Sequence, residues 1–94
     1  MRVRITRRAA LDIRLQIDWL TERSPRSAAK AVSLILDAVS LLSRHPLSGR
    51  EIDIGLRETQ VRFGLSGFVI RYQVRQHEVI VKRVFHGAQD RSSP

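Results

Sequence analysis

Two long helical patterns meet at Ser24-Pro25 with no linker between them, and this junction limits the possible folds more than any other feature of the sequence. Serine is a favoured helix N-cap, and proline suits the first helical position because its missing N–H group would have no partner there. The first pattern covers about residues 7–23, and the second runs to about Arg44, with Pro46 as its stop. Two amphipathic helices joined this closely are expected to form an antiparallel hairpin.

Alternating apolar and polar residues predict strands on both sides of this hairpin. A short strand is expected over residues 2–6, and three more at about residues 56–62, 67–74 and 79–85. Residues 47–55 are interpreted as a loop and residues 75–78 as a tight turn. The order β-α-α-β-β-β in a single domain of residues 1–94 predicts an α+β fold, with the helical hairpin packed on one face of a mostly antiparallel sheet.

The turn at residues 75–78 also predicts the register of the last two strands, because Val74 and Val79 flank it and should face each other. The pairs expected beyond them are Tyr72–Val81, Ile70–Arg83 and Phe68–Phe85. This register gives one apolar core face with a single charged intruder, Arg83. The opposite face mixes apolar residues with basic ones, among them Arg71 and Lys82, which is typical of a binding surface.

The second helix is apolar on two sides, because Leu34, Ala38 and Leu41 widen its core stripe. A helix of this kind is either buried on two faces or binds a partner. We therefore expect a homodimer or a complex with another chain.

The charge of the chain is strongly positive, with 17 basic and 9 acidic residues and a net charge of +8. Only Lys30 and Lys82 among the basic residues are lysines. The balance predicts an anionic partner, either a nucleic acid or an acidic polypeptide. A compositional bias toward arginine is an alternative reason for the ratio of arginine to lysine, but it explains the net charge poorly.

Several classes of site are not expected. The chain has no cysteine, so disulfides, thiolate metal sites and cysteine nucleophiles are excluded. Its three histidines fall in different predicted elements, its carboxylates are scattered, and no glycine-rich phosphate loop opens a helix. No apolar run approaches the ~20 residues that span a bilayer, and arginines interrupt the N-terminus too often for a signal peptide. We expect a soluble cytoplasmic protein without metal or cofactor.

One constellation of residues could still carry chemistry. Metal-free RNA cleavage needs a base, an acid and a cation near the phosphate. His86 could serve as acid or base, Arg62 or Arg83 as the cation, and Glu58 as a second base. In the structural alternative, which the spacing alone favours, His86 ends the last strand, Arg83 forms a half-buried ion pair and Glu58 is solvated.

The sequence resembles the ParE branch of the RelE/ParE superfamily of bacterial toxins over nearly its whole length. The matching pieces are Ala10, Ile13, Ile17 and Leu20 in the first helix, the Ser24-Pro25 break, His45-Pro46-x-x-Gly49-Arg50, Leu56-Arg57-Glu58, Phe68-Val69-Ile70-x-Tyr72 and, most specifically, His86-Gly87-Ala88-Gln89-Asp90-Arg91. The resemblance implies the fold predicted above. It also implies a cytoplasmic toxin of a type II toxin–antitoxin system, of the kind linked to plasmid stabilization. Such a toxin is held inactive by the acidic and apolar C-terminal segment of an antitoxin encoded beside it.

The resemblance implies two alternative targets, because ParE-type toxins poison DNA gyrase and RelE-type toxins cut mRNA on the ribosome. The ribonuclease members are similar to one another in having an Arg on the second strand, a basic residue or His after the last strand, and an aromatic residue near the C-terminus. Arg62 and His86 match the first two features, but no aromatic residue follows Phe85, and Gly87 offers no side chain. This departure favours gyrase and a toxin without catalysis of its own. A third possibility is a degenerate toxin that only binds its antitoxin.

The residues assigned on this basis form three sets. The antitoxin-binding set is Leu34, Ala38, Leu41, Arg71 and Lys82. The target-binding set is Arg57, Arg75, His86 and Arg91, and the set for a ribonuclease is His86, Arg62 and Arg83.

Overall fold

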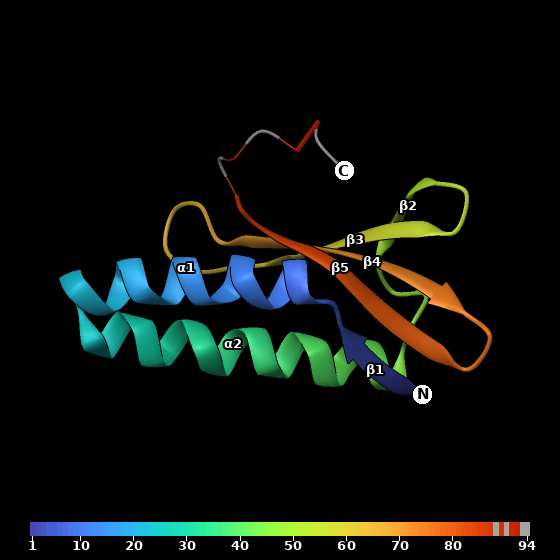
Figure 1. Ribbon diagram of the computed structural model, residues 1–94, viewed down its shortest axis with the longest axis horizontal. Helices are drawn as coiled ribbons and strands as arrows, with labels where there is room; N and C mark the ends of the chain where they lie inside the picture. The colour runs from blue at the N-terminus through green and yellow to red at the C-terminus, as the bar shows by residue number, and fades with distance from the viewer. Residues whose placement is uncertain (88, 90, 93–94) are drawn as a thin grey trace.

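The computed structural model describes residues 1–87, 89 and 91–92, so Ala88 and Asp90 of the C-terminal motif lie outside the described residues. The elements follow in the order β1 (Arg2–Ile5), α1 (Arg7–Arg23), α2 (Pro25–Arg44), β2 (Arg50–Asp53), β3 (Leu56–Val61), β4 (Phe68–Arg75) and β5 (Glu78–His86). The two helices lie side by side as a hairpin, and the strands form one sheet in the order β1-β5-β4-β3-β2 (Figure 1). Among the described residues, no helix has the length and apolarity to cross a bilayer.

The predicted α+β architecture is confirmed, with one strand more than the sequence indicated. β1 pairs with β5 in parallel and the other neighbours are antiparallel, so the sheet is mixed. The prediction that residues 47–55 form only a loop is wrong, because β2 lies within them and pairs Arg50 with Glu58 and Glu51 with Arg57. β2 is short and carries no apolar alternation, so only its pairing with β3, across a turn at Gly55 with φ +70°, makes it a strand.

The register of the β4–β5 hairpin agrees with the prediction near the turn and then departs from it. Val74 faces Val79 and Tyr72 faces Val81, but a bulge between Arg71 and Tyr72 then shifts the pairing by one residue. The predicted pairs Ile70–Arg83 and Phe68–Phe85 are therefore wrong. The observed pairs are Arg71–Arg83, Ile70–Val84, Val69–Phe85 and Phe68–His86. The bulge leaves Lys82 unpaired in the ladder and turns Arg83 and Phe85 onto the face away from the core.

The core lies between the helices and the inner face of the sheet. Its buried members are Ala9, Ala31, Ile35, Leu42, Val61, Phe68, Ile70, Tyr72, Val79, Val81 and Val84. Both helices begin after a capping side chain: Thr6 accepts from Ala9 N–H, and Ser24, as predicted, accepts from Ser27 N–H. The described part of the core contains no charged side chain from β5, because the bulge makes Val84 rather than Arg83 face the helices.

The loop after α2 is fixed by two side chains of the sheet. Gly49 N–H donates to the Tyr72 hydroxyl at 2.8 Å, and Arg57 Nη1 donates to the carbonyl groups of Gly49 at 2.8 Å and Leu47 at 3.3 Å. A Cβ atom on Gly49 would lie 2.5 Å from the Tyr72 hydroxyl oxygen, so the approach requires glycine. Arg57, expected to contact a target, thus holds this loop, with a side chain 22% exposed.

Tyr72→Phe is expected to lower the free energy of unfolding by about 1–3 kcal/mol, because it removes the acceptor of a buried backbone N–H group without changing the ring. Urea unfolding measures the change. Gln73→Ala in the same strand is the control, with an expected loss within about 0.5 kcal/mol. Equal stability of the two variants would show that the hydroxyl does not hold the loop.

Candidate functional site

The free edge of β5 is completed by side chains of α1. β1 pairs with Glu78 to Val81, so within the described part of the chain the C-terminal half of β5 has no strand beside it on that edge. Asp12 Oδ2 accepts from Val84 N–H at 3.0 Å, and Gln16 Nε2 donates to the Val84 carbonyl at 2.9 Å. Two polar residues one helical turn apart therefore satisfy the strand edge that a neighbouring strand would otherwise pair with.

Asp12 also forms a buried ion pair with Arg83. Arg83 Nε donates to Asp12 Oδ2 at 2.9 Å, and the two residues are 6% and 8% exposed. Arg8 adds a weaker contact with Asp12 Oδ1 at 3.4 Å. Arg83 thus forms the ion pair that the structural alternative predicted, but it is buried rather than half-buried.

A row of charged residues crosses the outer face of the sheet, the face away from the helices. Glu58, Arg71 and Arg83 face one another on β3, β4 and β5. Arg71 pairs with Glu58 Oε2 at 2.8 Å, and the guanidinium groups of Arg71 and Arg83 lie 4.9 and 4.6 Å from the ring centre of Phe85. Adjacent like charges are tolerated here because each arginine has its own carboxylate and both contact the same aromatic ring.

The described part of the C-terminal segment returns to this row. Arg91 Nε lies 3.5 Å from Glu58 Oε1, and the Arg91 carbonyl accepts from Arg71 Nη2 at 3.0 Å. The expectation of a solvated Glu58 is wrong, because this residue is 7% exposed, and the Arg71 side chain, assigned to the antitoxin-binding set, is only 12% exposed. The cross-strand pairing explains the low exposure of both side chains, because each charge is compensated by the opposite charge of its partner.

The structure does not bring the three ribonuclease candidates into one cavity. Arg83 is buried against Asp12, whereas Arg62 lines a small cavity of about 100 Å³ together with Arg91. His86 lines a separate, larger pocket. Among the described residues, no group of three His, Asp or Glu side chains could hold a metal ion.

The target-binding set is also dispersed. Arg75 lies at the turn end of β4, and His86 at the far end of β5, opposite Phe68. Both are exposed, whereas Arg57 and Arg91 are half-buried in the contacts described above. Arg75 and His86 are therefore the members of the set with exposed side chains that a large partner could contact.

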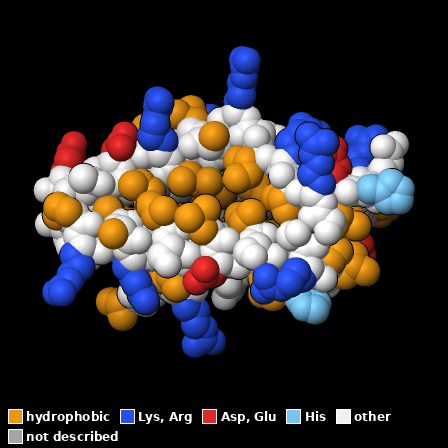
Figure 2. Space-filling model, turned by 90° about the horizontal axis from the view of Figure 1, so that it is seen from below, with side chains coloured by type: hydrophobic (Ala, Val, Ile, Leu, Met, Phe, Trp, Pro, Cys, Tyr) orange, Lys and Arg blue, Asp and Glu red, His pale blue; other side chains and the backbone are white. Residues whose placement is uncertain are grey.

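The antitoxin-binding set marks a surface that is partly apolar. Leu34 and Ala38 pack against the core while remaining half-buried, and Leu41 is 42% exposed. Viewed from the side of the helices, a hydrophobic band runs along the molecule (Figure 2). Lys82 is exposed at the bulge of β5.

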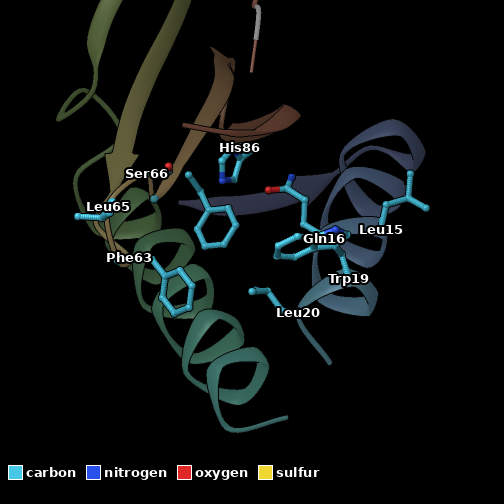
Figure 3. Close-up of a pocket in the computed structure, with 11 residues that line it drawn as sticks. Leu15, Gln16, Trp19, Leu20, Phe63, Leu65, Ser66 and His86 are labelled. Carbon is cyan, nitrogen blue, oxygen red and sulfur yellow. The ribbon is translucent and has the colours of Figure 1, made fainter. Parts of the chain in front are cut away.

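A pocket beside the C-terminal half of α1 was missed by the sequence analysis. It has a volume of about 540 Å³, and its lining includes Leu15, Trp19, Phe63, Leu65 and His86 (Figure 3). The signal that could have found its helical side is a second apolar row, Leu11, Leu15 and Trp19, at a spacing of four residues. The other side comes from the β3–β4 connection, which no local pattern places beside α1.

Comparison with known proteins identifies the family. A family model described as "ParE toxin of type II toxin-antitoxin system, parDE" matches residues 3–91. The chain belongs to the ParE toxin family.

Other members and a solved structure agree with this placement in the ParE family. Toxin RelE1 of Caulobacter vibrioides is 38% identical over 89 residues, covering 95% of this chain and 96% of that toxin. Toxin RelE3 of the same organism is 34% identical over 84 residues, covering 89% and 91%. A chain of the chromosomal ParDE TA system from P. aeruginosa superimposes with a TM-score of 0.73 at 26% identity, covering 92% of this chain and 95% of that one. The predicted resemblance is thereby confirmed, and the chain is a toxin of a type II toxin–antitoxin system.

Asp12→Ala is expected to lower the free energy of unfolding by about 3–5 kcal/mol, because it removes the carboxylate that Arg83 and the edge of β5 both use. Urea unfolding followed by circular dichroism measures the loss. Asp18→Ala, on an exposed position of the same helix, is expected to change stability by no more than about 0.5 kcal/mol. If the two variants unfold at the same urea concentration, Asp12 does not hold α1 to the sheet.

Proposed function

We propose that this ParE-family toxin acts in the cytoplasm as a growth inhibitor that binds DNA gyrase, carries out no catalysis of its own and is neutralised by a cognate antitoxin. The observation that carries the proposal is the state of the arginines on the outer sheet face. Arg83 and Arg71 form ion pairs with Asp12 and Glu58, and their side chains are only 7% and 12% exposed. Stabilising charge on a phosphate requires cations that converge on it from an accessible site.

The absence of an aromatic residue after Phe85 in the sequence supports the same proposal, since the resemblance associates such a residue with ribonuclease members. His86, which that activity would need as acid or base, lies on the lining of a largely apolar pocket, whereas Arg62 lines a different cavity. A toxin that binds its target needs exposed side chains but no converging acid and base. Arg75 and His86 are the candidates for those contacts.

A ribosome-dependent mRNA endonuclease is the alternative. Arg62 and Arg91 line the same small cavity, so two cations approach one site on the outer face. The names of the similar Caulobacter vibrioides toxins contain RelE, which is also the name of the branch that cuts mRNA. A substitution of His86 distinguishes the two functions, because only the nuclease would require this side chain for chemistry.

Purified wild-type toxin at micromolar concentration is expected to block supercoiling of relaxed plasmid by gyrase, or to trap cleaved plasmid, and antitoxin should reverse the effect. His86→Ala should change the inhibitory concentration by less than about tenfold, because a binding surface rarely depends on one peripheral residue. A toxin that is folded and stops growth, yet leaves gyrase unaffected, would contradict the proposal. Loss of ribosome-dependent mRNA cleavage in His86→Ala would then establish the alternative.

The antitoxin is proposed to cover the apolar stripe that Leu34, Ala38 and Leu41 form on α2, called the band below. An acidic and apolar segment suits this band, because the chain as a whole carries a net charge of +8. Lys82 can contribute a charge contact at the edge of the sheet. Arg71 forms an ion pair with Glu58, so we propose that it contributes only weakly to direct contact with the antitoxin.

Leu41→Glu is expected to weaken antitoxin binding by about tenfold or more, because it places a charge in the band and repels an acidic partner. Isothermal titration calorimetry measures the affinity. Leu36→Glu is the matched control: Leu36 lies on the same helix, is 60% exposed and points away from the stripe of Leu34 and Leu41. Equal affinities of the two variants would remove the band from the interface.

A further inference from the structure

The pocket at the C-terminal half of α1 has the size and lining of a binding site. Its volume of about 540 Å³ lies within the range of sites for small ligands and side-chain anchors. Phe63 and Phe68 form one wall with stacked rings 5.6 Å apart, and Leu15 and Trp19 form the wall opposite. Leu65 is fully exposed at the mouth of the pocket. The occupant must therefore bring a largely apolar group.

One polar atom in this pocket lacks a partner. Gln16 Oε1 is buried, and among the described residues no donor reaches it, while Nε2 of the same amide donates to the Val84 carbonyl. Figure 3 shows the Gln16 oxygen directed toward the side of the pocket where His86 lies. A buried acceptor without a donor is unfavourable, so an occupant that carries an N–H or O–H group would gain from meeting it.

The apolar surface continues from the pocket along α1. Leu11, Leu15 and Trp19 are 37%, 57% and 56% exposed and follow one another at successive turns. At a rise of 1.5 Å per residue the row is about 12 Å long, which is more than one small molecule covers. Its length suits a segment of another chain that lies along α1 and inserts one side chain into the pocket.

The bound segment could come from a second copy of this chain or from another protein, and its charge distinguishes the two. A second copy of this chain would also carry a charge of +8, so the overall charges of two copies would repel each other. Arg8 and Arg23 flank the row, with Arg23 stacked 3.7 Å above the ring of Trp19. An acidic segment is attracted to the same residues.

We infer that this pocket receives an aromatic side chain with a hydrogen-bond donor, a tryptophan or a tyrosine, from an acidic amphipathic segment of the antitoxin. The ring packs between Phe63 and Trp19, and its N–H or O–H group donates to Gln16 Oε1. The inference rests on the proposed function in one respect, that an antitoxin binds this toxin. It adds a second contact surface, separate from the band of Leu34, Ala38 and Leu41.

The position of the contact is tested with the full-length toxin and its purified antitoxin. Leu15→Glu is expected to weaken binding at least about tenfold, and Leu36→Glu, equally exposed on the other helix, by less than about twofold. Circular dichroism confirms that both variants are folded. If the wild type does not bind the antitoxin, the proposed function fails. If the wild type binds and Leu15→Glu binds equally well, the inference fails while the proposed function stands.

The hydrogen bond is tested with two small probes, indole and 1-methylindole, which differ in the ring N–H group. Indole should bind about fivefold more tightly than 1-methylindole. The affinity of each probe is measured from the shift of the Gln16 side-chain amide signal in NMR titrations. Matched shifts at Phe63 would place both probes in the same pocket. Equal affinities, or no binding of either probe, would overturn the assignment of Gln16 as an acceptor for the partner.

Discussion

The arrangement of the whole molecule depends on one buried carboxylate. Asp12 accepts from Arg83 and from the backbone N–H group of Val84, and so joins α1 to the C-terminal half of β5. Since α2 follows α1 without a linker, the same contact also positions the hairpin over the core. The register shift at the bulge is a condition for this arrangement, because it turns Arg83 away from the core and toward Asp12.

The ion pairs that follow from this arrangement determine where positive charge is available. Arg71, Arg83 and Arg91 all approach carboxylates on or beside the outer sheet face, so each of these positive charges has a carboxylate partner within the protein. The exposed arginines lie instead on the helices, on β1 and β2 and at strand ends, for example Arg14 on α1 and Arg75 at the end of β4. Dispersed charge attracts an extended acidic partner along its whole length, whereas phosphoryl chemistry needs cations gathered at one point.

The sequence predicts those features that depend on neighbours along the chain. The caps at Thr6 and Ser24, the helical hairpin and the pairing of Val74 with Val79 all follow from local patterns. The bulge, β2 and the burial of Glu58 depend on residues that meet only across strands, so no local pattern contains them. The candidate site divides in the same way: the exposure of Leu41 follows from the period of its helix, whereas the covering of Arg71 does not.

Helix α1 has three different faces, and this explains why its pocket is easily overlooked. Ile13 and Ile17 pack on the core, Asp12 and Gln16 satisfy the edge of β5, and Leu15 and Trp19 face outward. Gln16 belongs to two of these surfaces, because one end of its amide holds Val84 while the other opens into the pocket. A donor bound at Oε1 polarises the amide and strengthens the Nε2 hydrogen bond to Val84. A partner that donates to Oε1, as proposed above, would therefore stabilise the junction on which the fold already depends.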